Sequence, residues 1–225
     1  MIKIENFEIY GLRAAVRGMR NPMNSWDKSD SERDGFGGAD GFTVGTNDLG
    51  LMKRLIKGGT EHRKFLRMIT VTTDIVAPLY WWKEFDTYKV GTVANSCSTM
   101  HKIHSKEFTL EDFSCEHLVG FDDYNHPFNE GYHIKHHFMN VLKDTITTLN
   151  AARKLYLETN DKLFWWQMIQ LLPSSYNQRR TVQLNYEVLL AQYHQRKGHK
   201  LDEWRQYCEW VESLPYMTEF LEVAK

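Results

Sequence analysis

Apolar residues recur at helical spacing through most of the second half of the chain. Between Gly131 and Tyr156 they return every three or four positions, which is the pattern of one face of a long amphipathic helix. Asp161 has a side chain suited to a helix N-cap, and Pro173 marks where the next helix must end. The helices expected in this half cover residues 131–156, 161–172, 182–196 and 201–213, with a short one after Pro215.

The first half carries shorter patterns of both periods. Apolar residues at positions 2, 4 and 9 predict a strand, and a helical turn follows over residues 12–16. Residues 65–73 alternate apolar with polar side chains and are rich in β-branched residues, which predicts a second strand. Residues 87–129 have no sustained period and are expected to be mostly irregular.

Glycine, proline and capping side chains indicate where the helices of this half begin and end. One helix is expected to end at Gly58 and Gly59, because glycine tolerates a positive φ. A second is expected to run through Trp82 with Pro78 in or near its first turn, where a missing N–H does little harm. The expected N-caps are Asn47 or Asp48, Asp74, and Thr109 in a capping box with Asp112.

These elements predict an α+β fold, with a small antiparallel sheet packed against long helices. No Pro- or Ser-rich linker separates two apolar patterns, so residues 1–225 are expected to form a single domain. A polar, glycine-rich loop at about residues 18–46 has too little apolar surface to fix itself. It is either a ligand lid or a flexible insertion.

Composition excludes some partners. Lys and Arg total 28 against 29 acidic residues, so no global field draws the protein to polymeric nucleic acid or to anionic lipid. The first residues lack the layout of a signal peptide, and no apolar run is long enough to span a membrane. The three cysteines are odd in number and widely spaced. We therefore expect reduced thiols, a cytoplasmic location and no membrane partner.

Histidines gather before and within the first predicted long helix. His133 and His137 are four residues apart, so they share a helix face and could bind one ion. A tight zinc site usually has two pairs of ligands at short fixed spacing, which this segment lacks. We expect a polar helix face and no metal. The residues concerned are Cys115, His117, His126, His133, His136 and His137.

Two segments carry residues suited to an anionic ligand. In residues 80–99, small hydroxyl side chains crowd a stretch to which Lys83 and Lys89 add positive charge. Alternatively, the hydroxyls form ordinary turns and the two tryptophans at 81–82 belong to the core. In residues 172–185, Arg179 and Arg180 are expected just before a helix start, where they would suit a phosphate, or else they are solvated arginines at a surface turn.

At these segments the chain resembles the flavin-dependent thymidylate synthases. That family has a glycine-histidine-glutamate segment, a strand, an arginine-histidine-arginine motif after a helix, and a serine-rich loop. This chain has Gly58-Gly-Thr-Glu-His62 and then Tyr80-Trp-Trp-Lys-Glu-Phe85. Lys83 falls at the first motif arginine, while Glu84 and Phe85 replace histidine and arginine. Ser96 or Ser98 would stand in for the nucleotide-contacting serine.

The carboxy-terminal part resembles the same family more closely. Leu172-Pro173, Tyr176 and the run from Arg179 to Asn185 match a leucine-proline, tyrosine, arginine, threonine-valine-asparagine pattern. Arg196 corresponds to a second nucleotide-binding arginine. The order of elements therefore agrees with the family over most of the chain.

The resemblance implies a function and a set of site residues. It implies a homotetramer that binds FAD and a pyrimidine nucleotide, with a folate one-carbon donor possible, and reductive methylation of dUMP or a related nucleotide. Flavin would carry the hydride, and no side-chain nucleophile is expected. The alternative is a non-catalytic binding or assembly protein that kept the fold and lost the cofactor. The residues expected near flavin are His62, Lys83, Glu84, Gln183 and Asn185, and those near the nucleotide are Tyr80, Ser96, Ser98, Arg179, Arg180 and Arg196.

Overall fold

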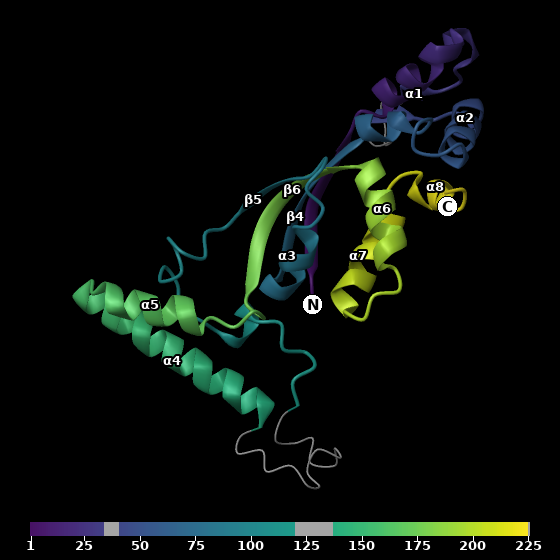
Figure 1. Ribbon diagram of the computed structural model, residues 1–225. Coiled ribbons are helices and arrows are strands. Elements are labelled where there is room, and N and C mark those ends of the chain that lie inside the picture. The colour runs from purple at the N-terminus through teal and green to yellow at the C-terminus, as the bar shows by residue number, and fades with distance from the viewer. Residues whose placement is uncertain (34–40, 120–136, 225) are drawn as a thin grey trace, which may run out of the picture. The chain divides into compact units, whose positions relative to one another are not determined.

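The computed structural model describes residues 1–33, 41–119 and 137–224 (Figure 1). Helices and a small antiparallel sheet make up this part of the chain, which confirms the predicted α+β class. The four-stranded sheet has the order β1 (Lys3–Tyr10), β4 (Thr70–Pro78), β6 (Asn177–Asn185) and β5 (Val93–Ser96). β1 is the strand that the first apolar positions predicted.

β4 differs from its predicted position. It pairs antiparallel with β1, from Lys3 opposite Val76 to Tyr10 opposite Thr70. Alternate residues of β4 are buried up to Ala77, and this alternation keeps the chain extended through Asp74. The predicted strand at residues 65–73 is therefore correct only from Thr70 onward, and the predicted helix cap at Asp74 is wrong. Residues 64–68 form a 3-10 helix, and α3 (Leu79–Phe85) begins only after β4 ends at Pro78.

The predicted glycine-rich loop contains more structure than its composition suggested. α1 (Leu12–Arg20) continues past the predicted turn, and α2 (Thr46–Lys57) ends at the glycines as predicted. Between them, β2 (Glu32–Arg33) pairs antiparallel with β3 (Phe42–Thr43). Residues 34–40 lie outside the described part, and the two interpretations of this loop, lid and insertion, both stay predictions.

The start of α2 is capped from outside the helix. Gly45 is the N-cap residue, so the predicted caps Asn47 and Asp48 are wrong. Instead, the carboxylate of Asp30 accepts hydrogen bonds from the backbone N–H of Asn47 at 2.7 Å and of Asp48 at 3.0 Å. A carboxylate at this end of a helix also offsets the positive end of the helix dipole.

A buried ion pair ties α1 to α2. Arg20 Nε lies 2.5 Å from Asp48 Oδ1, and the side chains of Arg20 and Asp48 are 5% and 0% exposed. The second carboxylate oxygen of Asp48 accepts hydrogen bonds from the hydroxyls of Ser29 and Ser31, each at 2.6 Å. A buried charge is tolerated only when it is paired and hydrogen-bonded, as it is here. This polar cluster orders a segment that has few apolar residues of its own.

The helices of the second half are α4 (Phe138–Thr159), α5 (Lys162–Leu171), α6 (Tyr186–Arg196), α7 (Asp202–Glu212) and α8 (Met217–Leu221). The last two follow the prediction, as does α5 with its N-cap at Asp161. The predicted helix at residues 182–196 is wrong in its first part. Val182 and Leu184 are buried at alternate positions of β6, and Asn185 then caps α6 by accepting from the backbone N–H of Val188 at 3.0 Å.

The chain folds into two compact units. The hairpin unit consists of Met1, Ala77–Lys83 and Ser96–Arg179, and it contains the helix pair α4 and α5 (Figure 1). The main unit consists of Ile2–Val76, Glu84–Asn95 and Arg180–Lys225. The core of the hairpin unit includes Phe108, Phe113, Leu142, Leu149 and Met168. The core of the main unit includes Leu12, Met52, Tyr186, Trp204, Tyr207 and Phe220. That the chain forms one domain stays a prediction.

We expect Asp161→Ala to lower the free energy of unfolding by about 1 kcal/mol. The Asp161 carboxylate accepts the backbone N–H of Leu163 at 2.8 Å, and alanine would leave that donor at the start of α5 without its cap. Asp161→Asn is the matched control, because asparagine caps a helix about as well as aspartate. Equal urea unfolding midpoints for the two variants would contradict the assignment.

Candidate functional site

An open pocket of about 510 Å³ lies in the main unit. Its size falls within the range of small-molecule sites, roughly 300–1,000 Å³. The turn that follows α3 forms one wall, residues of α6 between Glu187 and Gln195 form another, and Arg67 completes the lining. The residues that bear on its chemistry are Arg67, Tyr88, Lys89, Gly91, Asn185 and Glu187.

Gly91 lets the turn approach the start of α6 closely. Its φ is +76°, a backbone conformation that other residues adopt only with strain. A Cβ at this position would lie 2.6 Å from Nδ2 of Asn185 and 3.1 Å from Cγ2 of Val188. Because Asn185 is also the N-cap of α6, the turn packs directly on a helix N-terminus, where the helix dipole favours an anion.

The pocket has cations at its surface and a carboxylate in its wall. Arg67 and Lys89 are exposed and bring positive charge to it. Glu187 Oε1 accepts from Arg63, whose Nε and Nη2 lie 3.1 and 3.0 Å away. Glu187 Oε2 is buried and has no hydrogen-bond partner among the described residues. The pocket therefore offers an anion two cations, while the carboxylate of Glu187 lies in its wall.

Tyr88 connects this pocket to a second group of polar residues. Its hydroxyl donates to Gln195 at 2.9 Å and accepts from Arg196 Nε at 2.7 Å. Arg196 Nη1 lies 2.8 Å from Glu84 Oε1, and its guanidinium carbon lies 4.8 Å from the centre of the Trp204 ring. With hydrogen bonds on both sides of its hydroxyl, the Tyr88 ring is a fixed wall of the pocket.

Glu84 is held as a carboxylate within this group. Trp204 Nε1 donates to its Oε2 at 2.7 Å, and His199 Nε2 lies 3.3 Å from its Oε1. Partial burial alone raises the pKa of Glu84, but the hydrogen bond from Trp204 and the charge of Arg196 outweigh it and lower the pKa from 4.5. The structure thus pairs two residues that the sequence assigned to different ligands, Glu84 to flavin and Arg196 to nucleotide.

The other predicted site residues of the main unit are dispersed. His62 lies in the turn after α2, beside Gly58, and Gln183 is exposed on β6. Arg180 Nη1 lies 2.7 Å from Asp86. Asn185 is the predicted residue that lines the pocket. The predicted position of Arg180 just before a helix is wrong, because β6 continues to Asn185 and α6 begins only at Tyr186.

Five predicted residues belong to the hairpin unit. Arg179 is exposed on β6, not before a helix as predicted, and its carbonyl accepts from the N–H of Cys97 at 2.9 Å. That bond brings the serine loop beside Arg179: Ser96 ends β5, and Ser98 Oγ accepts from the backbone N–H of His101 at 2.9 Å. The remaining two lie in α3, where Tyr80 is half-buried and Lys83 is exposed. Ligand contacts by all eleven residues stay predictions.

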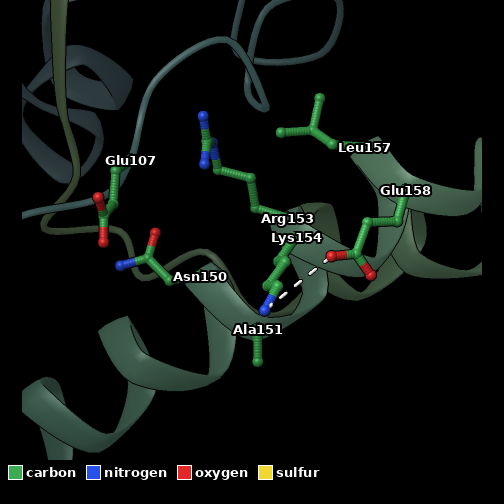
Figure 2. A pocket seen from close by; sticks show the side chains of 7 residues that line it. All are labelled: Glu107, Asn150, Ala151, Arg153, Lys154, Leu157 and Glu158. Carbon is green, nitrogen blue, oxygen red and sulfur yellow. Dashed lines mark ion pairs between the residues drawn. The ribbon is translucent and has the colours of Figure 1, made fainter.

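A second pocket of about 510 Å³ lies beside α4 in the hairpin unit (Figure 2). Its charges largely cancel: Lys154 is 4.0 Å from Glu158, and Glu107 lies on the opposite side from this pair. Arg153 extends from the same helix, and its Nε donates to the carbonyl of His104 at 2.9 Å. The pocket near α6 is therefore the better candidate for an anionic ligand.

Within residues 1–33, 41–119 and 137–224, no group of three His, Cys, Asp or Glu side chains is placed to hold a metal ion. Of the histidines considered from the sequence, His117 and His137 are described, whereas His126, His133 and His136 lie outside that part. The shared site of His133 and His137 therefore stays a prediction. No described helix is long and apolar enough to cross a membrane.

Solved structures resemble this chain over its whole length. Flavin-dependent thymidylate synthase ThyX from Helicobacter pylori, complexed with FAD and dUMP, superposes with a TM-score of 0.66 at 17% identity, covering 100% of this chain and 99% of that one. The UMP/dUMP methylase PolB from Streptomyces cacaoi, bound with 5-Br dUMP, gives 0.59 at 14% identity, covering 100% and 95%. The chain has the ThyX fold. No protein-family model and no curated protein sequence matches it.

The ThyX fold confirms the resemblance seen in the sequence, although several pocket residues were missed. Lys89 was noted only as a source of charge, and Arg67, Tyr88 and Glu187 were not identified. Arg67 and Glu187 lie far apart in the sequence and meet only through the fold. Gly91, in a stretch of hydroxyl and basic residues, is the one local signal of a close turn.

Proposed function

We propose that the protein binds a pyrimidine nucleotide such as dUMP together with FAD, and that it methylates the nucleotide reductively. Support comes from one observation above others: the full-length likeness to two proteins whose bound ligands include dUMP or its 5-bromo derivative. The pocket near α6 is this chain's contribution to the ligand site. The homotetramer and the folate donor are further parts of the proposal, carried by the family resemblance alone.

The residues of the pocket fit both ligands. Arg67, Lys89 and the N-terminus of α6 suit a phosphate, which FAD and dUMP both carry. Bound FAD would supply hydride transfer, chemistry that no side chain in this chain can supply.

The protein's own part is to bind and orient. The cations neutralise phosphate charge, and the Tyr88 ring, fixed at its hydroxyl by Arg196 and Gln195, gives a flat surface for a ligand ring. Gly91 and Asn185 keep the turn close to α6, so the anion site stays formed without ligand. Glu84 holds Arg196 in place, and the other N–H groups of that guanidinium can still donate.

A second function is favoured by a specific observation. Glu84 replaces the histidine of the family motif and is engaged by Arg196 and Trp204, while the next residue, Phe85, is buried in the core. A carboxylate and a buried phenyl ring provide none of the positive charge of the arginine-histidine-arginine motif. The second candidate is accordingly a non-catalytic protein that binds a nucleotide or assembles with itself and holds no flavin.

Calorimetry with dUMP, with and without added FAD, tests the proposal. We expect dUMP to bind, deoxyuridine to bind much more weakly because it lacks the phosphate, and the protein to take on the yellow colour of flavin. Nucleotide binding by a protein that stays colourless after incubation with FAD would favour the non-catalytic candidate. No binding of either ligand at millimolar concentration would contradict both nucleotide functions.

A further inference from the structure

A separate small pocket lies in the main unit beside α1. Its volume is about 210 Å³, and its lining includes Arg13, Arg17, Arg20, Trp26 and Phe42. None of these residues lines the pocket near α6. The two pockets are therefore different sites, and a ligand of one need not bind the other.

The walls of this pocket carry unusual positive charge. α1 has the sequence Leu-Arg-Ala-Ala-Val-Arg-Gly-Met-Arg, with basic but no acidic residues. Arg13 and Arg17 are four residues apart, so their side chains lie on the same face of the helix. Both are exposed, and no ion pair joins either of them to another described residue.

The third arginine, Arg20, adds no net charge to the pocket, because its charge is neutralised by a carboxylate. Arg20 is paired with the buried Asp48, and it also donates to the carbonyls of Ser25 and Lys28 at 3.1 and 3.0 Å. The hydroxyls of the lining serines, Ser29 and Ser31, already donate to Asp48. The charge available to a ligand therefore comes from Arg13 and Arg17.

Trp26 adds a flat apolar surface next to these cations. The residue is 51% exposed, although a tryptophan is usually buried for most of its area. The indole is nevertheless held in place, because its Nε1 donates to Asn21 Oδ1 at 2.8 Å. A fixed and exposed indole beside two exposed guanidinium groups suits a ligand with one ring and one acidic group.

We propose that this pocket binds a small anion that carries an aromatic ring. The acidic group, a phosphate or a carboxylate, would take the forks of Arg13 and Arg17, and the ring would lie against Trp26. A volume of about 210 Å³ holds one ring with its acidic group but not a dinucleotide such as FAD. The site is independent of the nucleotide site proposed above.

Phenyl phosphate and benzoate are suitable probes, read out by the indole N–H signals of ¹⁵N-labelled protein. The signal of Trp26 is assigned by its loss in Trp26→Phe. We expect saturable shifts of this signal with either probe, and affinities at least about tenfold weaker in Arg13→Ala and in Arg17→Ala. Inorganic phosphate and phenol, each lacking one half of the probe, should bind at least about tenfold more weakly than phenyl phosphate. Preference for one of the two probes would identify the acidic group.

The control variant is Arg54→Ala, which removes an exposed arginine of α2 that does not line the pocket. It should bind the probes as the unmodified protein does. The proposal is overturned if Arg17→Ala and Arg54→Ala weaken binding equally, or if inorganic phosphate binds as tightly as phenyl phosphate. In either case the arginines provide only general surface charge. Arg17→Ala should bind dUMP as tightly as the unmodified protein does. A failure of the probe experiment would therefore leave the proposed function standing, and a failure to bind dUMP would leave the pocket beside α1 standing.

Discussion

Replacement of Asp48 by Ala should lower the free energy of unfolding by about 3–5 kcal/mol, because it strands the buried guanidinium of Arg20 without its counter-charge. The same change removes the acceptor used by the hydroxyls of Ser29 and Ser31. Urea unfolding at neutral pH measures the effect. Asp27→Ala, which removes an exposed carboxylate from the same part of the chain, is the matched control and should cost less than about 0.5 kcal/mol.

The same carboxylate should make stability depend on acid pH. Burial by itself raises the pKa of Asp48, but hydrogen bonds from Ser29, Ser31 and Arg20 outweigh it and lower the pKa below its ordinary value of 3.8. The charged Asp48 carboxylate therefore contributes fully to the free energy of unfolding above pH 3.8, the pKa it has in the unfolded chain. This contribution is lost as the pH falls through the lower pKa that the carboxyl has in the folded protein. Asp48→Asn has no charge to titrate, so its stability deficit should shrink as the pH falls below that value. A deficit that is constant across this range would contradict the assignment.

Replacement of Lys89 or Arg67 by Ala is expected to weaken dUMP binding by about 1.5–3 kcal/mol, or roughly ten- to a hundredfold, if the nucleotide phosphate binds in the pocket near α6. Both side chains are exposed and removable without disturbing the core, so the loss would come from binding and not from folding. Calorimetry on each variant gives the dissociation constant, and its dependence on salt should fall as each cation is removed.

Lys57→Ala provides the control for this prediction. Lys57 is an exposed cation at the end of α2 and does not line the pocket, so its removal should leave the affinity for dUMP unchanged. If Lys57→Ala and Lys89→Ala behave alike while Arg179→Ala abolishes binding, the phosphate lies at the residue that the sequence resemblance assigned, and the pocket near α6 has another role.

Features that depend on neighbouring residues could be predicted from the sequence. Thr109 and Asp112 form the predicted capping box, and Asp161 caps α5. The role of Asp48 could not be predicted from its neighbours in the sequence. Its side chain and position suit a helix cap, but a contact with Arg20, 28 residues away, takes it into the interior. No local pattern indicates that contact.

The secondary structure of the segment before α6 could not be predicted from local pattern either. Val182 and Leu184 fit the start of a helix as well as one face of a strand, and only pairing within the sheet decides between them. The candidate site was missed for a related reason. Arg67 and Glu187 carry no motif, and the fold alone brings them to one pocket. The resemblance identified the fold because it rested on the order of elements, which survives when individual residues change.

The two compact units have a consequence for how this protein can be divided. Apart from Met1, which belongs to the hairpin unit, the chain passes from the main unit to the hairpin unit after Val76, returns after Lys83, leaves again after Asn95 and returns after Arg179. β4 and β6 each contain one of these crossing points. No single cut therefore yields one intact unit, and a continuous fragment of residues 77–179 would also take residues 84–95 from the main unit, with Tyr88, Lys89 and Gly91. Expression of either unit alone requires a rejoined chain, not a truncation.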